Sequence, residues 1–362
     1  MRKIIVFVTN DLSTDQRVDK ICTTLFELNL DVLLVGRLLP KSKMVERTYA
    51  TKRFRLWFNT GPLFYANYNI RLFFFLLFNK TDFLWANDLD TLCANYLIAR
   101  LKNKKLIFDS HEYFTEVPEL IDRPLVKSFW KFIERRILPN LENVLTVSPS
   151  IVLLYKKEYN IDAKLLRNLP VKNKPFVKID NIKSHGKKVL IYQGAININR
   201  GIEYMVEAMQ YIDNAILYII GSGDISDKII RLIKVLDLDK KVKMIGEIPL
   251  EKIHGYTKQA DLGLSLEEEK GLNYRFSLSN KLFNYIQAGL PVLVSPLLEM
   301  KIIVNHYEIG KIISRHEAEH IAKEVNLMIN NQKRMSIWSR NAKKAALELN
   351  WEKEKYIIED LF

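Results

Sequence analysis

The chain has 362 residues, of which 48% are hydrophobic and 27% are charged. This length predicts two domains or one large α/β unit, and the composition excludes a disordered chain. Lysine and arginine number 55 against 42 aspartates and glutamates, so the net charge is +13 and an anionic partner is expected. Nucleic acid, an anionic membrane surface and phosphorylated substrates all satisfy that expectation.

Cysteine content and apolar segments bear on the compartment in which the protein works. Cys22 and Cys93 are too few for a disulfide framework and lack metal-ligand spacing, which favours a reducing compartment. The apolar run 4–8 is too short for a signal peptide, and 72–78 is far below the roughly 20 residues of a membrane span. We therefore expect a cytoplasmic protein, either free or peripheral on the inner face of the plasma membrane.

Short β-branched runs alternate with amphipathic segments of helical length along the chain. The runs expected to form strands are 3–8, 31–35, 82–86, 105–108, 143–147, 188–193, 215–220, 241–245, 261–266, 291–295 and 311–313. Helical segments between them include 16–28, 89–101, 202–209, 225–236 and 281–288. Most of the strand runs are continuously apolar, as strands buried on both faces are, so the alternation predicts an α/β fold with doubly wound parallel sheets.

The alternation is interrupted once, near the middle of the chain. Residues 170–187 contain two prolines and five lysines with little apolar periodicity, which indicates a linker. We expect an N-terminal Rossmann-like domain (1–170), a linker (171–187), a C-terminal Rossmann-like domain (188–335) and a helical segment (336–362) that can pack back on the N-terminal domain. Ligands bind beyond the carboxyl ends of parallel strands, so the loops after strands are expected to face an interdomain cleft.

The clearest local motif is SLSNKLFNYIQAGLP (277–291). Ser279 suits a helix N-cap, and Gly289 suits the position just after the helix. The expected buried stripe is Leu282, Tyr285 and Ile286, and the expected polar face is Asn280, Asn284 and Gln287 with Lys281 beside them. Free N–H groups and the positive dipole end at the helix start attract a diphosphate. A well-capped surface helix without a ligand fits the pattern equally well.

A second motif, YQGAININRG (192–201), combines a strand end, a glycine turn and a helix start. Gly194 allows a ligand to approach the backbone, and Arg200 at the helix entrance offers a fork of donors to phosphate. Ordinary turn chemistry with a solvated arginine is the alternative. The segment after the next strand, which begins with Gly221, resembles this motif and is read first as turn chemistry.

Polar residues also follow two strands in the first half of the chain. His111 is the only histidine in that half, and its place after a buried strand favours a functional role over the structural role that isolated histidines usually have. Asp88 and Asp90 follow the preceding strand at a spacing that is compatible with a metal site. Because such pairs often occur by chance, we favour a helix N-cap and expect no metal.

Residues 37–55 concentrate positive charge, with seven basic residues and one acid. The basic residues are Arg37, Lys41, Lys43, Arg47, Lys52, Arg53 and Arg55, and an aromatic run follows them. Basic residues beside aromatic ones suit an anionic lipid surface. A solvated loop followed by a core helix explains the segment equally well. Nucleic acid ranks below both, because no nucleic-acid-binding motif accompanies the charge.

Seven segments in order along the chain resemble the retaining GT-B glycosyltransferases of family 4. They are DQRVDK (15–20), ANDLDTL (86–92), FDSHEYFTEVPEL (108–120), LLRNLP (165–170), YQGAININRGIEY (192–204), ADLGLSL (260–266) and SNKLFNYIQAGLPVLVS (279–295). The resemblance covers nearly the whole chain. It implies two Rossmann-like domains that face an interdomain cleft, with the nucleotide-sugar on the C-terminal domain and the acceptor on the N-terminal domain.

The resemblance also implies roles for individual residues. It places His111 near the donor sugar, Arg200 at the diphosphate, and the helix start at Ser279, Asn280 and Lys281 around phosphate oxygens. Gly194 and Gly221 belong to the expected donor-binding set.

The sequence departs from the family pattern at three positions. Asn284 and Phe276 stand where the family has glutamates, and Ala195 stands where it has a second cation. Glu267, Glu268 or Glu269 can supply a carboxylate, and we take Glu268 as the candidate. Lys281 or Arg275 can replace the cation.

These expectations define a hexosyltransferase-type enzyme. It would transfer a sugar with retention from a UDP- or GDP-sugar to a glycan or lipid-linked acceptor in surface polysaccharide biosynthesis. His111, Arg200 and Lys281 are the expected catalytic residues, and neither a metal nor another cofactor is expected. Two alternatives stay open: a GT-B nucleotide-sugar epimerase, and a non-catalytic protein that binds glycan or nucleic acid.

Overall fold

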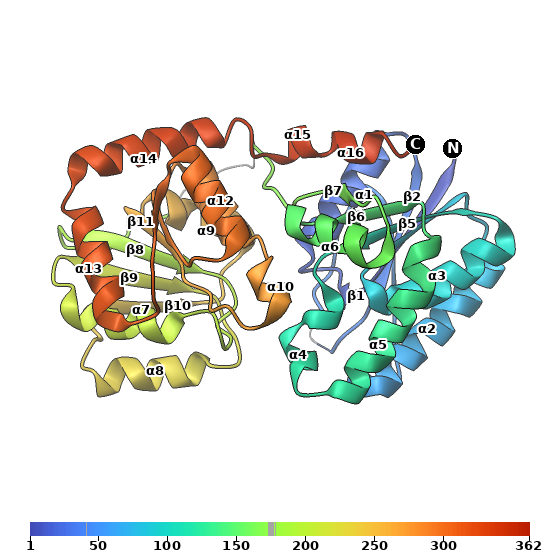
Figure 1. Cartoon of the computed structure of the whole chain (residues 1–362), viewed down its shortest axis with the longest axis horizontal. Helices are drawn as coiled ribbons and strands as arrows, with labels where there is room; N and C mark the ends of the chain where they lie inside the picture. The colour runs from blue at the N-terminus through green and yellow to red at the C-terminus, as the bar shows by residue number, and fades with distance from the viewer. Residues whose placement is uncertain (41, 173–176, 178) are drawn as a thin grey trace. The chain divides into compact units, whose positions relative to one another are not determined.

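The computed structural model describes residues 1–40, 42–172, 177 and 179–362 (Figure 1). The chain divides into two compact units. The first contains residues 1–168 together with 355–362, and the second contains residues 169–354. Part of the expected linker, at 173–176 and 178, lies outside the described residues. Among the described residues, no helix combines the length and the apolar character that crossing a membrane requires.

The first unit is built on a seven-stranded parallel sheet with the order β3-β2-β1-β4-β5-β6-β7. Its strands are β1 (Lys3–Asp11), β2 (Asp31–Arg37), β3 (Ala50–Phe54), β4 (Phe83–Asn87), β5 (Lys105–Ser110), β6 (Asn143–Thr146) and β7 (Lys164–Leu165). Its helices are α1 (Gln16–Glu27), α2 (Gly61–Phe78), α3 (Leu89–Lys102), α4 (Pro118–Ile121), α5 (Pro124–Ile137), α6 (Pro149–Tyr159) and α16 (Tyr356–Glu359), with short 3-10 turns at Phe114–Glu116 and Leu138–Asn140. The strand order reverses between β1 and β4, which is the place where open α/β sheets bind ligands.

The second unit contains a six-stranded parallel sheet with the order β10-β9-β8-β11-β12-β13. Its strands are β8 (Lys188–Gln193), β9 (Ala215–Ile220), β10 (Val242–Gly246), β11 (Leu262–Ser265), β12 (Val292–Val294) and β13 (Gly310–Ile312). Its helices are α7 (Ile202–Ala208), α8 (Ser226–Val235), α9 (Leu250–Lys258), α10 (Gly271–Arg275), α11 (Asn280–Ala288), α12 (Leu298–Tyr307), α13 (Ala318–Ile329), α14 (Gln332–Ala345) and α15 (Trp351–Glu354), with a 3-10 turn at Met209–Tyr211. Here the order reverses between β8 and β11.

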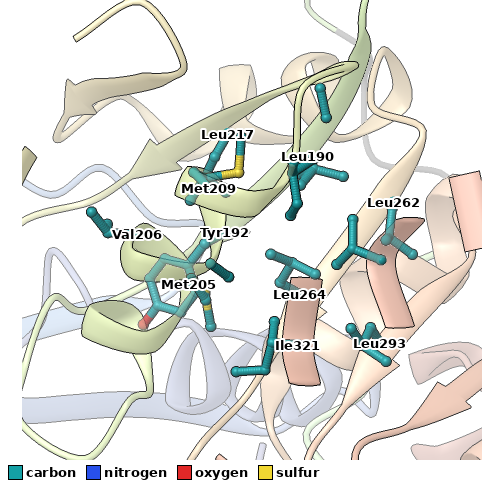
Figure 2. Packing of buried hydrophobic residues seen from close by; sticks show 14 of the residues in the cluster. Leu190, Tyr192, Met205, Val206, Met209, Leu217, Leu262, Leu264, Leu293 and Ile321 are labelled. Carbon is teal, nitrogen blue, oxygen red and sulfur yellow. The ribbon is translucent and has the colours of Figure 1, made fainter. Parts of the chain in front are cut away.

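A dry core holds this second sheet to its helices (Figure 2). Leu190 and Leu217 lie on neighbouring strands and belong to one cluster with Met205 of α7 and Met209 of the 3-10 turn after it. Ile321 of α13 belongs to the same cluster. All five side chains are almost completely excluded from water. Burying a side chain of this size contributes about 1.5–3 kcal/mol, so the core fixes the sheet whose loops carry polar residues.

The α/β fold class with two Rossmann-like parallel sheets is confirmed, and every expected strand is present. The sequence analysis missed β3 and β7. Strand β3 is an edge strand that pairs only with β2, and Ala50, Thr51 and Lys52 are exposed. Edge strands in proteins often carry charge, which prevents edge-to-edge pairing and removes the apolar run that identifies a buried strand. Strand β7 has only two residues.

The C-terminal segment expected as one piece, 336–362, is divided between the two units. Helix α14 begins at Gln332, before the expected boundary, and Ser339 donates a hydrogen bond to the Gly289 carbonyl within the second unit (2.7 Å). The last eight residues belong to the first unit. There the Phe362 ring packs on Phe83, with centroids 4.9 Å apart, and Lys105 donates to the Leu361 carbonyl (2.5 Å).

A glycine in β11 sets the distance between the second sheet and α11. A Cβ atom at Gly263 would lie 2.6 Å from the Tyr285 ring. Tyr285 is fully buried, and its hydroxyl donates to the carbonyls of Ile191 (3.2 Å) and Leu264 (3.0 Å). The ring therefore cannot retreat without breaking contacts on both strands.

We predict that Gly263→Ala lowers the free energy of unfolding of the second unit by about 1–3 kcal/mol, the usual cost of overpacking. Urea unfolding followed by tryptophan fluorescence measures the change. In a Tyr285→Ala background the same substitution should cost almost nothing, because the ring that it strikes is gone. An equal loss in both backgrounds would contradict the steric explanation.

Candidate functional site

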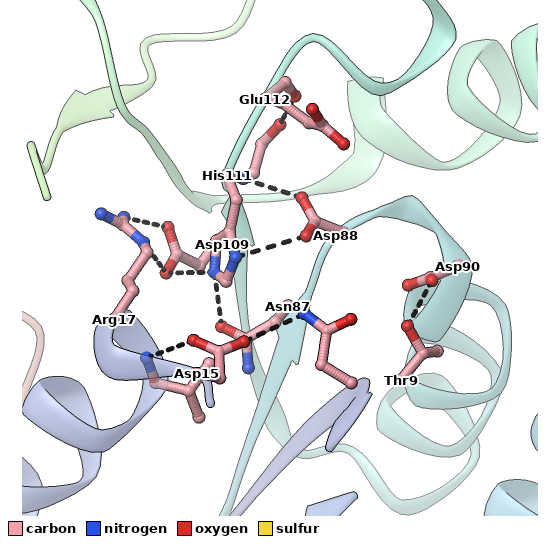
Figure 3. Close-up of polar contacts among 12 residues, drawn as sticks. Thr9, Asp15, Arg17, Asn87, Asp88, Asp90, Asp109, His111 and Glu112 are labelled. Carbon is pink, nitrogen blue, oxygen red and sulfur yellow. Dashed lines mark hydrogen bonds and ion pairs between the residues drawn. The ribbon is translucent and has the colours of Figure 1, made fainter. Parts of the chain in front are cut away.

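The first polar cluster lies at the carboxyl ends of β4 and β5 (Figure 3). His111 follows β5, and its backbone N–H donates to Asp88 (2.8 Å). Its Nδ1 lies 3.3 Å from Asp88 Oδ2, and its Nε2 lies 3.0 Å from Asn87 Oδ1 and 3.2 Å from Asp109 Oδ2. Both ring nitrogens are therefore held by side chains from the ends of the two neighbouring strands.

A buried arginine from α1 completes this cluster. Arg17 donates through Nε to Asp109 Oδ2 (3.0 Å) and through Nη2 to Oδ1 (2.5 Å), and its Nη1 donates to the Leu166 carbonyl (2.9 Å). Arg17 is 4% exposed and Asp109 is fully buried. Sequence reasoning assigned no role to Arg17. The available signal was the motif DQRVDK, in which Asp15 caps α1 by accepting a hydrogen bond from the Val18 N–H.

The charges of this cluster follow from its contacts. Burial alone would raise the pKa of Asp109, but the cations of Arg17 and His111 outweigh it and hold that pKa well below its usual value. Burial alone would lower the pKa of His111, but the carboxylates of Asp88 and Asp109 raise it to about 9. Burial raises the pKa of Asp88, and the imidazolium opposes that rise. At neutral pH the ring is thus a cation, which suits it to donate hydrogen bonds and not to accept a proton.

The expected N-cap role of Asp88 is only half correct. Asp88 occupies the N-cap position of α3, but its side chain makes no capping hydrogen bond, because its carboxylate is bound to His111. Asp90 accepts from the Thr9 hydroxyl instead (2.6 Å), and burial raises its pKa to about 6. The two carboxylates therefore have separate partners. Within the described residues, no group of three or more potential metal-binding side chains is found.

Two glycine turns lie at the second polar cluster, where β8 and β9 end. The Gly194 N–H donates to the Ile220 carbonyl and the Gly221 N–H to the Gly246 carbonyl, both at 2.9 Å. Each glycine has φ +138°, and a Cβ atom at Gly221 would lie 1.9 Å from the Gly194 carbonyl oxygen. Only glycine fits at Gly221, which agrees with the turn chemistry expected there.

A buried ion pair lies beside these turns. Lys281, in the first turn of α11, pairs with Glu267 from the loop after β11, and the two side chains are 7% and 2% exposed. Glu267 also accepts hydrogen bonds from Ser265 and Ser279, each at 2.9 Å. The Lys281 ammonium lies 3.1 Å from the Ser279 hydroxyl and 5.1 Å from the centre of the Tyr192 ring.

This ion pair corrects two expectations about α11. Lys281 does not lie on the polar face of the helix, because its ammonium is drawn inward to Glu267. Ser279 occupies the N-cap position but directs its hydroxyl to Glu267 and makes no capping bond. Burial alone would raise the pKa of Glu267, but Lys281 and Arg200 lower it to about 2, so the carboxylate stays charged. Burial and the Arg200 cation lower the pKa of Lys281.

Arg200 approaches the same cluster from the loop before α7. Its guanidinium lies over the Tyr274 ring, 5.3 Å from the centroid, and its positive charge acts on both Glu267 and Lys281. The buried Nε of Arg200 has no hydrogen-bond partner among the described residues. A buried donor without an acceptor is costly, and an anionic ligand would supply the acceptor.

The other expected donor-binding residues differ in their burial and location. Asn280 is exposed and Asn284 is half-buried, both on α11. Glu268, the chosen carboxylate, instead lines a groove between α7 and α8 with Glu203 and Tyr204. Glu267 is the loop carboxylate that reaches Lys281, so the choice of Glu268 is not supported by this geometry. Neighbouring side chains of an extended loop point in opposite directions, which sequence alone did not resolve.

Comparison with known proteins gives one family match and one curated relative. Residues 173–345, which lie in the second unit, match the family model of glycosyl transferases group 1. The uncharacterized glycosyltransferase MJ1607 of Methanocaldococcus jannaschii is 28% identical over 167 residues. That match covers 45% of this chain and 41% of the relative, so the chain matches less than half of the relative's length.

Solved structures match the fold along the whole chain. Sucrose-phosphate synthase (tll1590) from Thermosynechococcus elongatus superposes with a TM-score of 0.82 at 16% identity, covering 100% of this chain and 98% of that one. Anabaena Alr3699/HepE in complex with UDP and glucose gives a TM-score of 0.77 at 13% identity, covering 100% and 99%. At these identities the likeness shows the fold, and the expected GT-B fold class is confirmed.

We predict that the His111 ring titrates with an apparent pKa near 9, well above the ordinary 6.5, when followed by NMR of its ring protons. Asp88→Asn should lower the midpoint, because the substitution removes one of the two carboxylates that hold the proton. Asp122→Asn, which changes an exposed aspartate after α4, serves as the matched control and should leave the midpoint in place.

The raised pKa of His111 makes the stability of the first unit depend on pH. The folded pKa lies above the unfolded one, so protonated His111 stabilises the first unit fully below about pH 6.5, and this contribution is lost as the pH rises through about 9. A midpoint near 6.5 in the native protein would contradict the charge assignment.

Proposed function

We propose that the protein is a glycosyltransferase of the hexosyltransferase type. It takes its sugar from a UDP- or GDP-sugar bound by the second unit and transfers it to a glycan or lipid-linked acceptor. The observation that carries this proposal is the cation cluster of Lys281 and Arg200 beside the glycine turns at Gly194 and Gly221. The domain family of residues 173–345 supports it, as do structural neighbours solved with UDP and glucose.

The second unit's cluster suits a diphosphate for a chemical reason. An ammonium group has three donors, and Glu267 and Ser279 take two of the Lys281 donors within the described residues. We propose that the third donor, together with the unpartnered Nε of Arg200, binds phosphate oxygens. Glu267 orients the ammonium, and its own charge is compensated by three hydrogen-bond donors, so that it does not repel the ligand.

In the proposed reaction, the bond between the anomeric carbon and the distal phosphate oxygen breaks with the electron pair passing to phosphate. The acceptor hydroxyl oxygen bonds to the anomeric carbon, and its proton passes to the departing phosphate. The configuration at the anomeric carbon is retained. Arg200 and Lys281 stabilise the charge that develops on the diphosphate, and preorganised donors of this kind contribute roughly 3–4 kcal/mol each. His111 is the proposed catalytic residue of the first unit, and its imidazolium carries a positive charge.

Donor identity is tested by a thermal-shift screen over UDP, GDP and their sugars, since a ligand that binds the native state raises its melting temperature. A surface polysaccharide intermediate is the acceptor class that we propose to test next. Release of an isomerised nucleotide-sugar without acceptor would indicate an epimerase. A protein that binds no nucleotide would be a non-catalytic binding protein.

We predict that Arg200→Ala lowers the rate of nucleotide release from the nucleotide-sugar by about a hundredfold or more, because the departing diphosphate loses a preorganised cation. Arg334→Ala, an exposed arginine on α14, is the matched control and should retain the wild-type rate. A near-normal rate for Arg200→Ala would remove this residue from the mechanism.

We also predict that transfer does not require a divalent metal, because Arg200, Lys281 and the helix start offset the phosphate charge. Initial rates measured with EDTA should equal those measured without it. Loss of activity in EDTA that magnesium or manganese restores would contradict this proposal and would reopen a metal role for Asp88 and Asp90.

A further inference from the structure

Helix α2 of the first unit is apolar around its whole circumference. Of its 18 residues, Arg71 is the only charged one. Phe64, Tyr68 and Leu72 point inward and are buried. The opposite side carries large apolar residues in helical spacing that remain exposed to water, namely Leu63, Ile70, Phe74 and Phe78, with exposed fractions between 53% and 79%. A helix of this kind is ordinarily covered on both sides.

Two neighbouring helices extend the exposed apolar side of α2. Helix α3 packs against α2 and also against α5, and the three helices belong to the same part of the first unit (Figure 1). Leu97 and Leu101 of α3 are exposed, as are Leu125, Phe129 and Phe132 of α5. We call these nine residues on α2, α3 and α5 the apolar face. Large exposed apolar side chains gathered on three helices that pack together through α3 indicate an interaction site in a folded protein.

The exposed charged residues on the three helices of the apolar face have one sign. The only acidic residues in the three helices are Asp90 and Glu134, and both are buried. The exposed charged residues on α3 and α5 are Arg100, Arg135 and Arg136, all of them cations. The Arg136 guanidinium lies over the Phe132 ring, 5.3 Å from its centroid. Lys127 of α5 differs from these arginines, because it is half-buried and paired with Glu116.

We propose that the apolar face docks on an anionic lipid bilayer, with α2, α3 and α5 lying along the membrane surface. Exposed phenylalanine and leucine with arginine and without acids is the composition of interfacial helices. Contact with a second copy of this chain would place the same arginines against one another about a two-fold axis, with no exposed acid on these helices to pair with them. The charge therefore selects an anionic bilayer.

The apolar face shares no residue with 37–55, although Arg37 and Lys52 of that segment lie over Phe64 and Phe75 of α2. Several basic residues of that segment are used within the chain. Arg37 donates to the Asn59 carbonyl (3.0 Å), Arg53 donates to the Lys43 carbonyl (2.7 Å), and Arg47 pairs with Asp19 (2.8 Å). Lys41 lies outside the described residues. The apolar face stands on its own observations and does not depend on the proposed sugar transfer.

The test is flotation of the full chain with vesicles of phosphatidylcholine, with and without phosphatidylglycerol. The wild type should float with the anionic vesicles. The variant Ile70→Ser/Phe74→Ser/Phe78→Ser should lose more than about tenfold in partitioning, because it removes three exposed apolar side chains that the bilayer would bury. The matched control Val235→Ser/Leu327→Ser/Leu347→Ser changes three exposed apolar residues of the second unit and should float like the wild type.

A second variant separates the charge from the apolar contact. Arg135→Gln/Arg136→Gln should weaken flotation by roughly fivefold for each charge, and only with anionic vesicles. The melting temperature of each variant reports folding independently. Absent flotation of the wild type, or unchanged flotation of the α2 variant, would overturn the proposal. So would a wild-type dimer that the α2 variant dissociates, because the face would then cover a second copy.

Discussion

In each unit, a buried carboxylate holds a cation at the carboxyl edge of a parallel sheet. Asp109 holds Arg17 and His111 in the first unit, and Glu267 holds Lys281 in the second. Parallel strands end at the same edge, so short loops after them bring polar side chains together over an apolar core. A buried cation is stabilised by a carboxylate that stays charged, and Asp109 and Glu267 stay charged because neighbouring cations lower their pKa values.

The sequence allowed the strands and the glycine turns to be predicted because their causes are local. Residues 188–193 and 215–220 were expected as strands with the bounds that the structure has, since a continuous apolar run between turn signals has few other solutions. Gly194 and Gly221 follow those strands directly. The edge strand β3 was not predicted, because only its last residue, Phe54, is buried and the three residues before it are polar.

The partners of the polar residues could not be predicted in the same way, because they are set by packing between distant segments. Arg17 and Asp109 are 92 residues apart, and nothing in either neighbourhood identifies the other. Glu267 and Glu268 are adjacent and chemically identical, and only the direction of the loop decides which of them reaches Lys281. The amphipathic pattern of α11 placed Lys281 beside the polar face, whereas the pull of a buried carboxylate turned its side chain inward.

The excess of positive charge thus has several separate explanations. Some cations are internal, such as Arg17 and Lys281, whose partners are buried acids, and these add nothing to the field outside the protein. Others in residues 37–55 are bound by the chain itself. The arginines around the apolar face differ from both groups, because the acids on their own helices, Asp90 and Glu134, are buried. Only charge left uncompensated at the surface can attract a partner from solution, so the position of those arginines tells more about that partner than the net charge does.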